Sequence, residues 1–218
     1  MLRRSLLLAS FLLVGGCSKV SSMFADEPTR EQQARAVSAR AAAALMAGEF
    51  DAAVQLYEKA SSLAPNDPLP ALELGRLYAR LGNDGQAIMA LKRAAELAPG
   101  EGEPRGLLAD LYMRQGRPDV AVEQLKIAGE DVAQVPELRR KLATAQLRLG
   151  ETESAEQLVD KLYREDPGDP ETLALYAEVL LARGEEERAV RLLDAAVAGA
   201  GGESVRVRTA RARYFYSR

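Results

Sequence analysis

Few residues of this chain could carry covalent chemistry. The 218 residues include one cysteine, Cys17, and no histidine, so the commonest general base and the commonest ligand of transition metals are both missing. A single thiol forms neither an intramolecular disulfide nor a cysteine pair for zinc. No glycine-rich phosphate loop and no nucleophile motif accompany it. We therefore expect no catalytic residues, no metal site and no cofactor.

Two acidic clusters are the remaining candidates for a hydrolase with paired carboxylates: Glu151 with Glu153, and residues 185–187. Both follow a glycine and open a predicted helix. Carboxylates in a first helical turn stabilise the positive end of the helix dipole, which is the ordinary explanation. The net charge of −3 also argues against nucleic-acid binding. A binding protein is favoured over an enzyme, and no small-molecule substrate is expected.

The first sixteen residues predict an export signal. Arg3 and Arg4 form a positively charged start, and residues 6–14 form an apolar run. The run is too short to span a bilayer, which takes roughly 20 residues. Residues 1–16 are therefore interpreted as a signal peptide. The general secretory route is favoured, with the twin-arginine route as the alternative.

Cys17 ends the stretch Val14-Gly15-Gly16-Cys17, which resembles the lipobox of bacterial lipoproteins, although that family prefers leucine in place of Val14. The resemblance implies that the thiol accepts a diacylglyceryl group and that further acylation, for example with palmitate, follows. It also implies that Ser18 permits sorting to the periplasmic face of the outer membrane, in an organism with two membranes. The alternative is an ordinary cleaved signal with a coincidental cysteine. Residues 17–28 are interpreted as a flexible tether.

A regular internal repeat occupies the rest of the chain. Five glycines follow one another at a step of 34 residues: Gly48, Gly82, Gly116, Gly150 and Gly184. Each ends one amphipathic segment and precedes another, as expected where a helix ends in a residue with positive φ. Five residues after each glycine stands an alanine: Ala53, Ala87, Ala121, Ala155 and Ala189. Seven residues before each glycine the residue is also small: Ala41, Gly75, Ala109, Ala143 and Ala177.

The period, the small positions and the closing prolines Pro65, Pro99 and Pro167 resemble the tetratricopeptide repeat (TPR). The resemblance implies an all-α fold, a right-handed superhelical solenoid of about five helix pairs plus a C-terminal capping helix. The solenoid would span 29–218, with repeats 34–67, 68–101, 102–135, 136–169 and 170–203 and a cap at 204–218. The aromatic residue that the family often has at the fourth place is replaced by Val37, Ala71, Arg105, Arg139 and Leu173.

Three segments depart from the repeat or end it. Thr29 and Gln32 predict a capping box that opens the first helix. The third repeat ends irregularly at 129–135, which indicates either a softer joint or only a shortened helix. In the tail, alternating valine, arginine and alanine would suit a strand, but the repeat register favours a capping helix.

In the TPR family, the first helix of each pair lines a concave groove. Carried over by repeat position, the groove residues are Leu72, Arg76, Arg80, Asp110, Met113, Arg114, Arg140, Thr144, Leu147 and Arg148. Arg80, Arg114 and Arg148 recur at the repeat step and predict a basic row. Such a row would suit an extended peptide with acidic and apolar side chains. The alternative is that these arginines are simply solvated.

The tail is a second candidate surface. It concentrates positive charge in Arg206, Arg208, Arg211, Arg213 and Arg218, with Phe215 and Tyr216 beside them. These residues could contact a partner or an acidic envelope polymer, or could belong to a terminal cap, which is slightly favoured.

Taken together, the resemblance implies a non-catalytic protein-binding scaffold, anchored to a membrane through lipid. The architecture is similar to that of Tad/Flp and type IV pilus assembly lipoproteins, whose partner is an outer-membrane secretin or another pilus component. An alternative is an adaptor that organises peptidoglycan enzymes or exopolysaccharide export. The sequence names neither the partner nor the oligomeric state.

Overall fold

The computed structural model describes residues 27–199 and 204–216, so Cys17, Ser18 and the predicted signal peptide lie outside the described residues. Within those ranges all regular structure is helical, as predicted. The helices are α2 (Arg30–Met46), α3 (Phe50–Leu63), α4 (Pro68–Arg80), α5 (Asp84–Leu97), α6 (Gly102–Arg114), α7 (Pro118–Ile127), α8 (Glu130–Gln134), α9 (Pro136–Leu149), α10 (Thr152–Glu165), α11 (Pro170–Ala182), α12 (Glu186–Gly199) and α13 (Val205–Tyr216). None of the described helices is long and apolar enough to cross a membrane.

Each helix pair turns at one of the five repeated glycines. Gly150 has a φ of 80° and ends α9, and the other four glycines also have positive φ. The N–H of Glu151 donates to the Gln146 carbonyl at 2.9 Å, and the N–H of Gly150 donates to the Leu147 carbonyl at 3.1 Å. These two bonds form a Schellman motif, which uses helix carbonyls that would otherwise lack a donor. The predicted role of the glycines is confirmed.

The small residues lie where the two helices of a pair touch. The five alanines after the turns are all 0% exposed. On the facing helix, a Cβ added to Gly75 would lie 2.5 Å from Cγ of Leu91. The Leu91 side chain therefore occupies the space over Gly75, which explains why this position has no room for a larger side chain.

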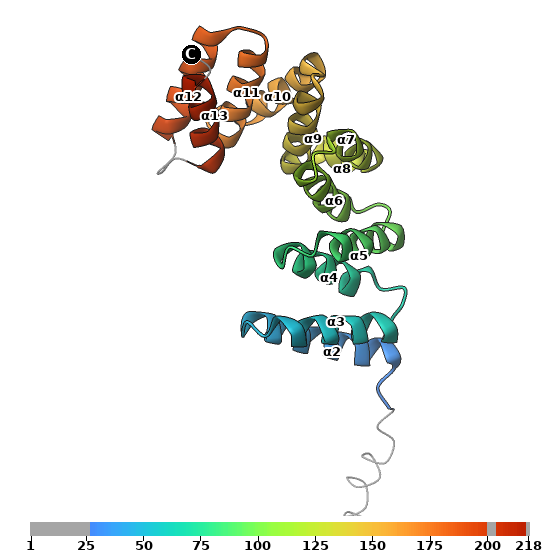
Figure 1. Ribbon diagram of the computed structural model, residues 1–218. Helices are drawn as coiled ribbons and strands as arrows, with labels where there is room; N and C mark the ends of the chain where they lie inside the picture. The colour runs from blue at the N-terminus through green and yellow to red at the C-terminus, as the bar shows by residue number, and fades with distance from the viewer. Residues whose placement is uncertain (1–26, 200–203, 217–218) are drawn as a thin grey trace, which may run out of the picture.

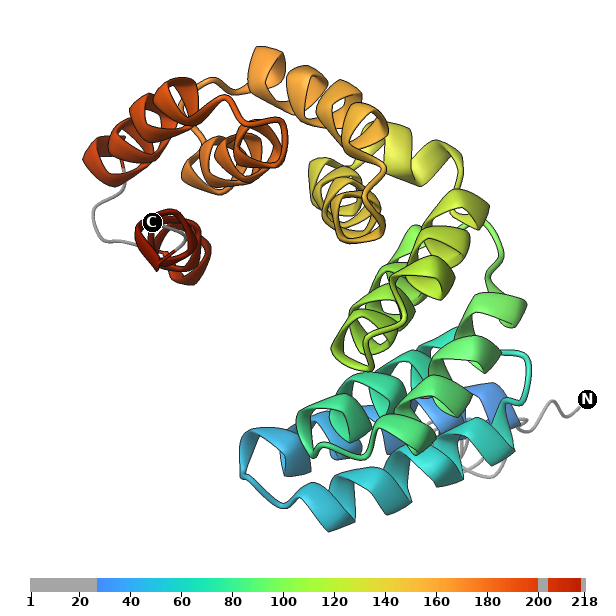
Figure 2. The ribbon, with the colours of Figure 1, turned by 45° about the horizontal axis from the view of Figure 1, so that its top comes forward.

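Successive pairs stack into a curved array (Figure 1). In the C-terminal half α9, α11 and α13 lie on the inner side of the arc, and α10 and α12 lie on its outer side (Figure 2). The inner helices α4, α6, α9 and α11 each pack on the outer helix of the pair before them, as α4 does on α3 and α11 on α10. This arrangement leaves one side of the inner helices free to form a concave face.

The third pair ends irregularly, as predicted. Its outer helix α7 stops at Ile127, and after Gly129 the chain forms the short helix α8. Val132 of α8 is buried, and the Asp131 carboxylate accepts a hydrogen bond from the Gly102 N–H. The segment is thus a shortened helix followed by a packed turn of helix, and its mobility stays a prediction.

Both ends of the array are helical. The Thr29 hydroxyl accepts from the Gln32 N–H at 3.2 Å, and the Gln32 side chain accepts from the Thr29 N–H at 2.9 Å. The predicted capping box is therefore confirmed. The tail forms the helix α13 and not a strand, with Val207 and Ala210 completely buried.

Candidate functional site

The concave face is the candidate site, and the structure places most of the predicted groove residues where solvent reaches them. Leu72 is the exception, because it is only 6% exposed and belongs to the core around α4. A leucine side chain gains more free energy from core packing than from contact with water, so this position serves stability. The prediction that Leu72 lines the groove is wrong. The other nine residues are exposed or half-buried.

Charged groove residues join neighbouring inner helices. Arg76 of α4 forms an ion pair with Glu103 of α6, and Asp110 of α6 forms one with Lys141 of α9. The predicted groove charges are thus partly used between repeats. The sequence suggested that Arg76 and Asp110 bind a ligand. Their ion-pair partners lie in the next repeat, and the spacing of residues alone does not reveal such pairs.

Arg140 continues this series from α9 to α11. Its guanidinium lies 2.6 Å from Asp169, the N-cap residue of α11, and 2.8 Å from Glu137. Burial disfavours the charged form of Arg140, but the hydrogen bonds that it donates to Glu137 and the attraction of Asp169 outweigh this effect and raise the pKa of Arg140. Arg140 is therefore a structural cation that is already neutralised by two carboxylates.

The three arginines of the basic row lie in the last turns of α4, α6 and α9, and all three are exposed. A cation there is favoured by the helix dipole. Arg114 forms an ion pair with Asp84 at 2.7 Å. Arg80 and Arg148 form no ion pair with another described residue. The row as a binding surface stays a prediction, and two of its guanidinium groups are available to a ligand.

The sequence did not predict a cleft of about 640 Å³ between α6 and α9. Gly102 and Gly106 line it, together with Leu138 and Val135, which is 41% exposed. A Cβ on Gly106 would lie 2.5 Å from Cδ2 of Leu138, so the missing side chain allows close helix contact. The two glycines, four residues apart at the start of the third repeat, are the signal that could have indicated this feature.

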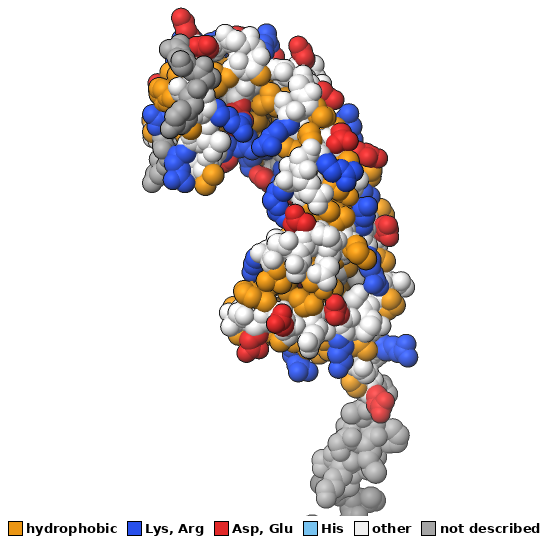
Figure 3. All heavy atoms as spheres, in the orientation of Figure 1, with side chains coloured by type: hydrophobic (Ala, Val, Ile, Leu, Met, Phe, Trp, Pro, Cys, Tyr) orange, Lys and Arg blue, Asp and Glu red, His pale blue; other side chains and the backbone are white. Residues whose placement is uncertain are grey.

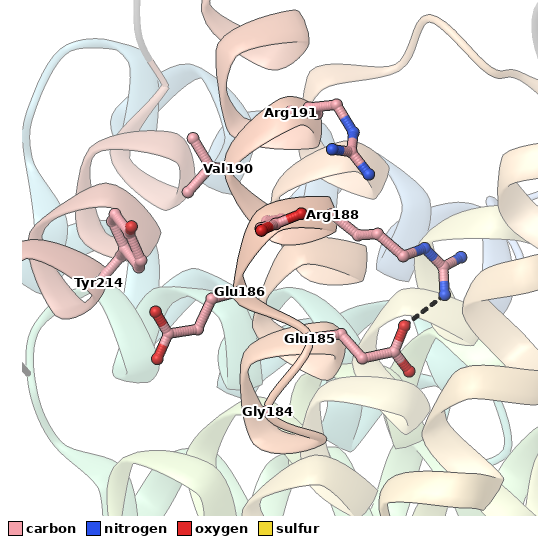
Figure 4. Close-up of a pocket in the computed structure, with 8 residues that line it drawn as sticks. Gly184, Glu185, Glu186, Arg188, Val190, Arg191 and Tyr214 are labelled. Atoms are coloured by element: carbon pink, nitrogen blue, oxygen red, sulfur yellow. Dashed lines mark hydrogen bonds and ion pairs between the residues drawn. The ribbon is translucent and has the colours of Figure 1, made fainter.

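The acidic clusters do not converge. Glu186 and Glu187 lie in the first turn of α12 and Glu153 in that of α10, as predicted. Glu185 forms an ion pair with Arg188, and in Figure 4 it points away from α13, whereas Glu186 points toward it. Between α12 and Tyr214 of α13 lies an open pocket of about 780 Å³. The described residues contain no group of three or more carboxylates or thiols that could hold a metal ion.

The fold and this surface together define an open solenoid of helical hairpins with a concave face lined by polar side chains. The family model described as tetratricopeptide repeat matches residues 71–198, and a second model of the same description matches residues 44–88. The chain belongs to the tetratricopeptide repeat family. Proteins of this family act as scaffolds for protein–protein interaction, and the predicted all-helical repeat fold is confirmed.

Solved structures with the same fold have low sequence identity to this chain. MamA is 21% identical with a TM-score of 0.67, over 76% of this chain and 91% of MamA. YrrB, described as a TPR protein with an unusual peptide-binding site, is 16% identical with a TM-score of 0.67, over 89% and 97%. The pilF protein of Pseudomonas aeruginosa is 17% identical with a TM-score of 0.68, over 86% and 91%. No curated protein matches the sequence.

Proposed function

We propose that this protein is a non-catalytic scaffold that helps to assemble a machine of the cell envelope, such as a pilus or secretin system. The observation that carries this proposal is the concave face of a TPR array, which offers an extended surface to a protein partner (Figure 2). The choice of an envelope machine rests on the resemblance to pilus assembly lipoproteins, and pilF is similar to this chain in fold.

The proposal includes a lipid anchor at Cys17 and, following the sorting signal at Ser18, a place on the periplasmic face of the outer membrane. The support is the lipobox-like stretch that ends in the only cysteine. Two or more acyl chains give stable anchoring, because each buried methylene contributes about 0.8 kcal/mol. Anchoring also raises the effective concentration of the scaffold for a partner in the same membrane.

The anchor is tested by Cys17→Ala. We expect the variant to leave the membrane fraction, because no thiol remains to accept the lipid. The measurement is the distribution of wild type and variant between carbonate-washed membranes and the soluble fraction. A Cys17→Ala protein that stays in the washed membranes would contradict the anchor.

The groove is tested by reversing Arg80, Arg114 and Arg148 together to glutamate. We expect the variant to lose its partner in native envelopes while keeping its helicity, because an acidic ligand would then meet like charge. A matched control reverses three exposed lysines on outer helices, Lys92, Lys126 and Lys161.

Photo-crosslinking from position 113, in place of the half-buried groove residue Met113 and with the three arginines kept, identifies the captured protein. A secretin or pilus component supports the proposal, whereas a cell-wall synthase or an exopolysaccharide exporter favours the adaptor described above. If the groove variant captures the same partner as the wild type and to the same extent, the basic row does not bind that partner.

A further inference from the structure

The C-terminal helix α13 departs from the packing rule of the array. The earlier inner helices pack on the outer helix of the preceding pair, but α13 packs chiefly on the inner helix α11. The open pocket between α12 and Tyr214 lies where a regular inner helix would press against its neighbour (Figure 4). The helix α13 therefore lies across the concave side and does not simply extend the stack.

Polar contacts hold α13 to this side. Arg206 lies 3.3 Å from Glu171 of α11, and its Nη2 donates to the Thr144 hydroxyl of α9 at 3.1 Å. Arg213 forms an ion pair with Glu178 of α11 at 2.9 Å. Figure 3 shows Lys and Arg side chains gathered in the hollow between α13 and α9. One helix thus spans the inner surface of two repeats.

The apolar part of this contact is small. Val207 and Ala210 are fully buried, whereas Val205 and Phe215 of the same helix are 71% and 62% exposed. By comparison, α11 buries eight residues. Because hydrophobic stabilisation scales with the apolar area removed from water, α13 is held more weakly than the interior helices.

A helix that covers the surface beneath α13 must supply a cation. The Glu178 side chain is only 11% exposed, and both Arg206 and Arg213 reach it. Glu171, which is 41% exposed, adds a second carboxylate. A carboxylate that a ligand removes from water is costly unless the ligand also pairs it, so a covering ligand with acidic side chains is disfavoured at this place.

We propose that the inner surface of α9 and α11 is a receptor for a basic amphipathic helix of a protein partner, and that α13 occupies this receptor until the partner displaces it. The inference rests on the scaffold function proposed above and names the chemistry of one of its ligands. The matching helix carries two basic residues seven positions apart, as Arg206 and Arg213 are, with small apolar residues on the same face between them.

The test uses the full chain and a labelled peptide of residues 204–216 added in trans. In wild type the attached α13 competes with the peptide at high effective concentration, so binding is weak. In Arg206→Glu/Arg213→Glu the attached helix loses its ion pairs, and we expect the peptide to bind about tenfold more tightly or better. Fluorescence anisotropy gives the affinity, and circular dichroism verifies that the array stays helical.

Two controls establish the specificity. Arg208→Glu reverses an exposed charge on the same helix and should leave peptide binding as in wild type. Adding Glu178→Arg to the double variant should abolish capture of the wild-type peptide, because the receptor then presents a cation and the attached helix, with glutamate at 206 and 213, can pair with it again. Equal binding of the wild-type peptide with and without Glu178→Arg, or equal binding by wild type and double variant, would overturn the proposed receptor.

A wild-type protein that dimerises by exchanging α13 would assign the surface to a second copy of the chain and would also overturn the proposal. The molecular mass of the wild-type protein in solution distinguishes a monomer from such a dimer. The peptide assay uses purified protein and does not depend on the envelope machine. Loss of capture in envelopes with intact peptide binding would therefore contradict the proposed function alone.

Discussion

At the scale of single residues, arginine occupies the fourth place of the third and fourth repeats, where the family often has an aromatic side chain. The Arg139 side chain is 3% exposed, lies 2.6 Å from Glu165 of α10, and donates to the Ala133 carbonyl of α8 at 2.7 Å. Arg105, at the same place one repeat earlier, donates to Gln124 at 3.4 Å. The long stems of these arginines fill the space of a ring, and their guanidinium groups bond to outer helices.

We expect Arg139→Ala to lower the free energy of unfolding by about 2–3 kcal/mol, because it removes packing and leaves the Ala133 carbonyl without its donor. Arg139→Met keeps most of the volume and should cost only about 1 kcal/mol. Urea denaturation measures both. If methionine is as harmful as alanine, the hydrogen bonds of Arg139 matter more than its packing.

Tyr176 offers a test of pH dependence. Burial and the hydrogen bond that its hydroxyl donates to Asp160 raise its pKa from 10.0 to about 12. The folded state therefore favours the neutral phenol. This contribution to stability is fully present below pH 10 and is lost as the pH rises through about 12.

Burial also raises the pKa values of Tyr57 and Tyr78, so an ultraviolet titration should show several late tyrosines. The phase near pH 12 should belong to Tyr176 and should disappear in Tyr176→Phe. In Asp160→Asn the pKa of Tyr176 should fall toward the ordinary value of tyrosine, because the carboxylate no longer raises it. A phase near pH 12 that persists in Tyr176→Phe would belong to another tyrosine.

At the scale of helices, α2 differs from the later inner helices on the face that would meet a preceding repeat. On α4 that face buries Pro70, Leu74 and Leu77. The residues at the same repeat positions of α2 are exposed: Ala36, Arg40 and Ala43. Small and charged side chains there end the array, because they offer a further helix little apolar area.

The helix contact at Ala87 should tolerate no added volume. Ala87 is 0% exposed at the contact within the second pair, so Ala87→Leu should cost about 1–3 kcal/mol by overpacking. The exposed Ala36→Leu serves as a matched control and should leave the melting temperature nearly unchanged. A melting temperature of Ala87→Leu equal to wild type would contradict the close approach of α4 and α5.

At the scale of the whole molecule, the core forms two clusters that meet within α9. One extends from Ala41 to Ala145 and the other from Ala143 to Ala210. In a solenoid each repeat is stabilised mainly by its neighbours, so a local defect should weaken the nearest repeats most.

Leu91→Ala and Leu175→Ala each remove a fully buried leucine from a different cluster and should cost about 2–5 kcal/mol. Hydrogen exchange should rise mainly in α2–α7 for Leu91→Ala and mainly in α10–α13 for Leu175→Ala. A uniform rise along the chain in both variants would indicate a single cooperative unit.

Much of the fold could be predicted from the sequence because its determinants are local. A glycine such as Gly150 is required wherever a helix must end with positive φ. A small residue such as Ala87 is required wherever two helices of one hairpin touch, and both requirements recur at the 34-residue step. The capping box of Thr29 depends on a residue only three positions away.

The functional surface was predicted less well, because the charge and exposure of its side chains depend on contacts between residues that are one repeat or more apart. Arg76 and Asp110 are tied to Glu103 and Lys141, and Leu72 turns into the core. The position of α13 depends on Arg206 reaching Thr144, 62 residues away. Periodicity determines which helices form and how they pair. Only packing in three dimensions decides which charges neutralise one another and which remain available to a partner.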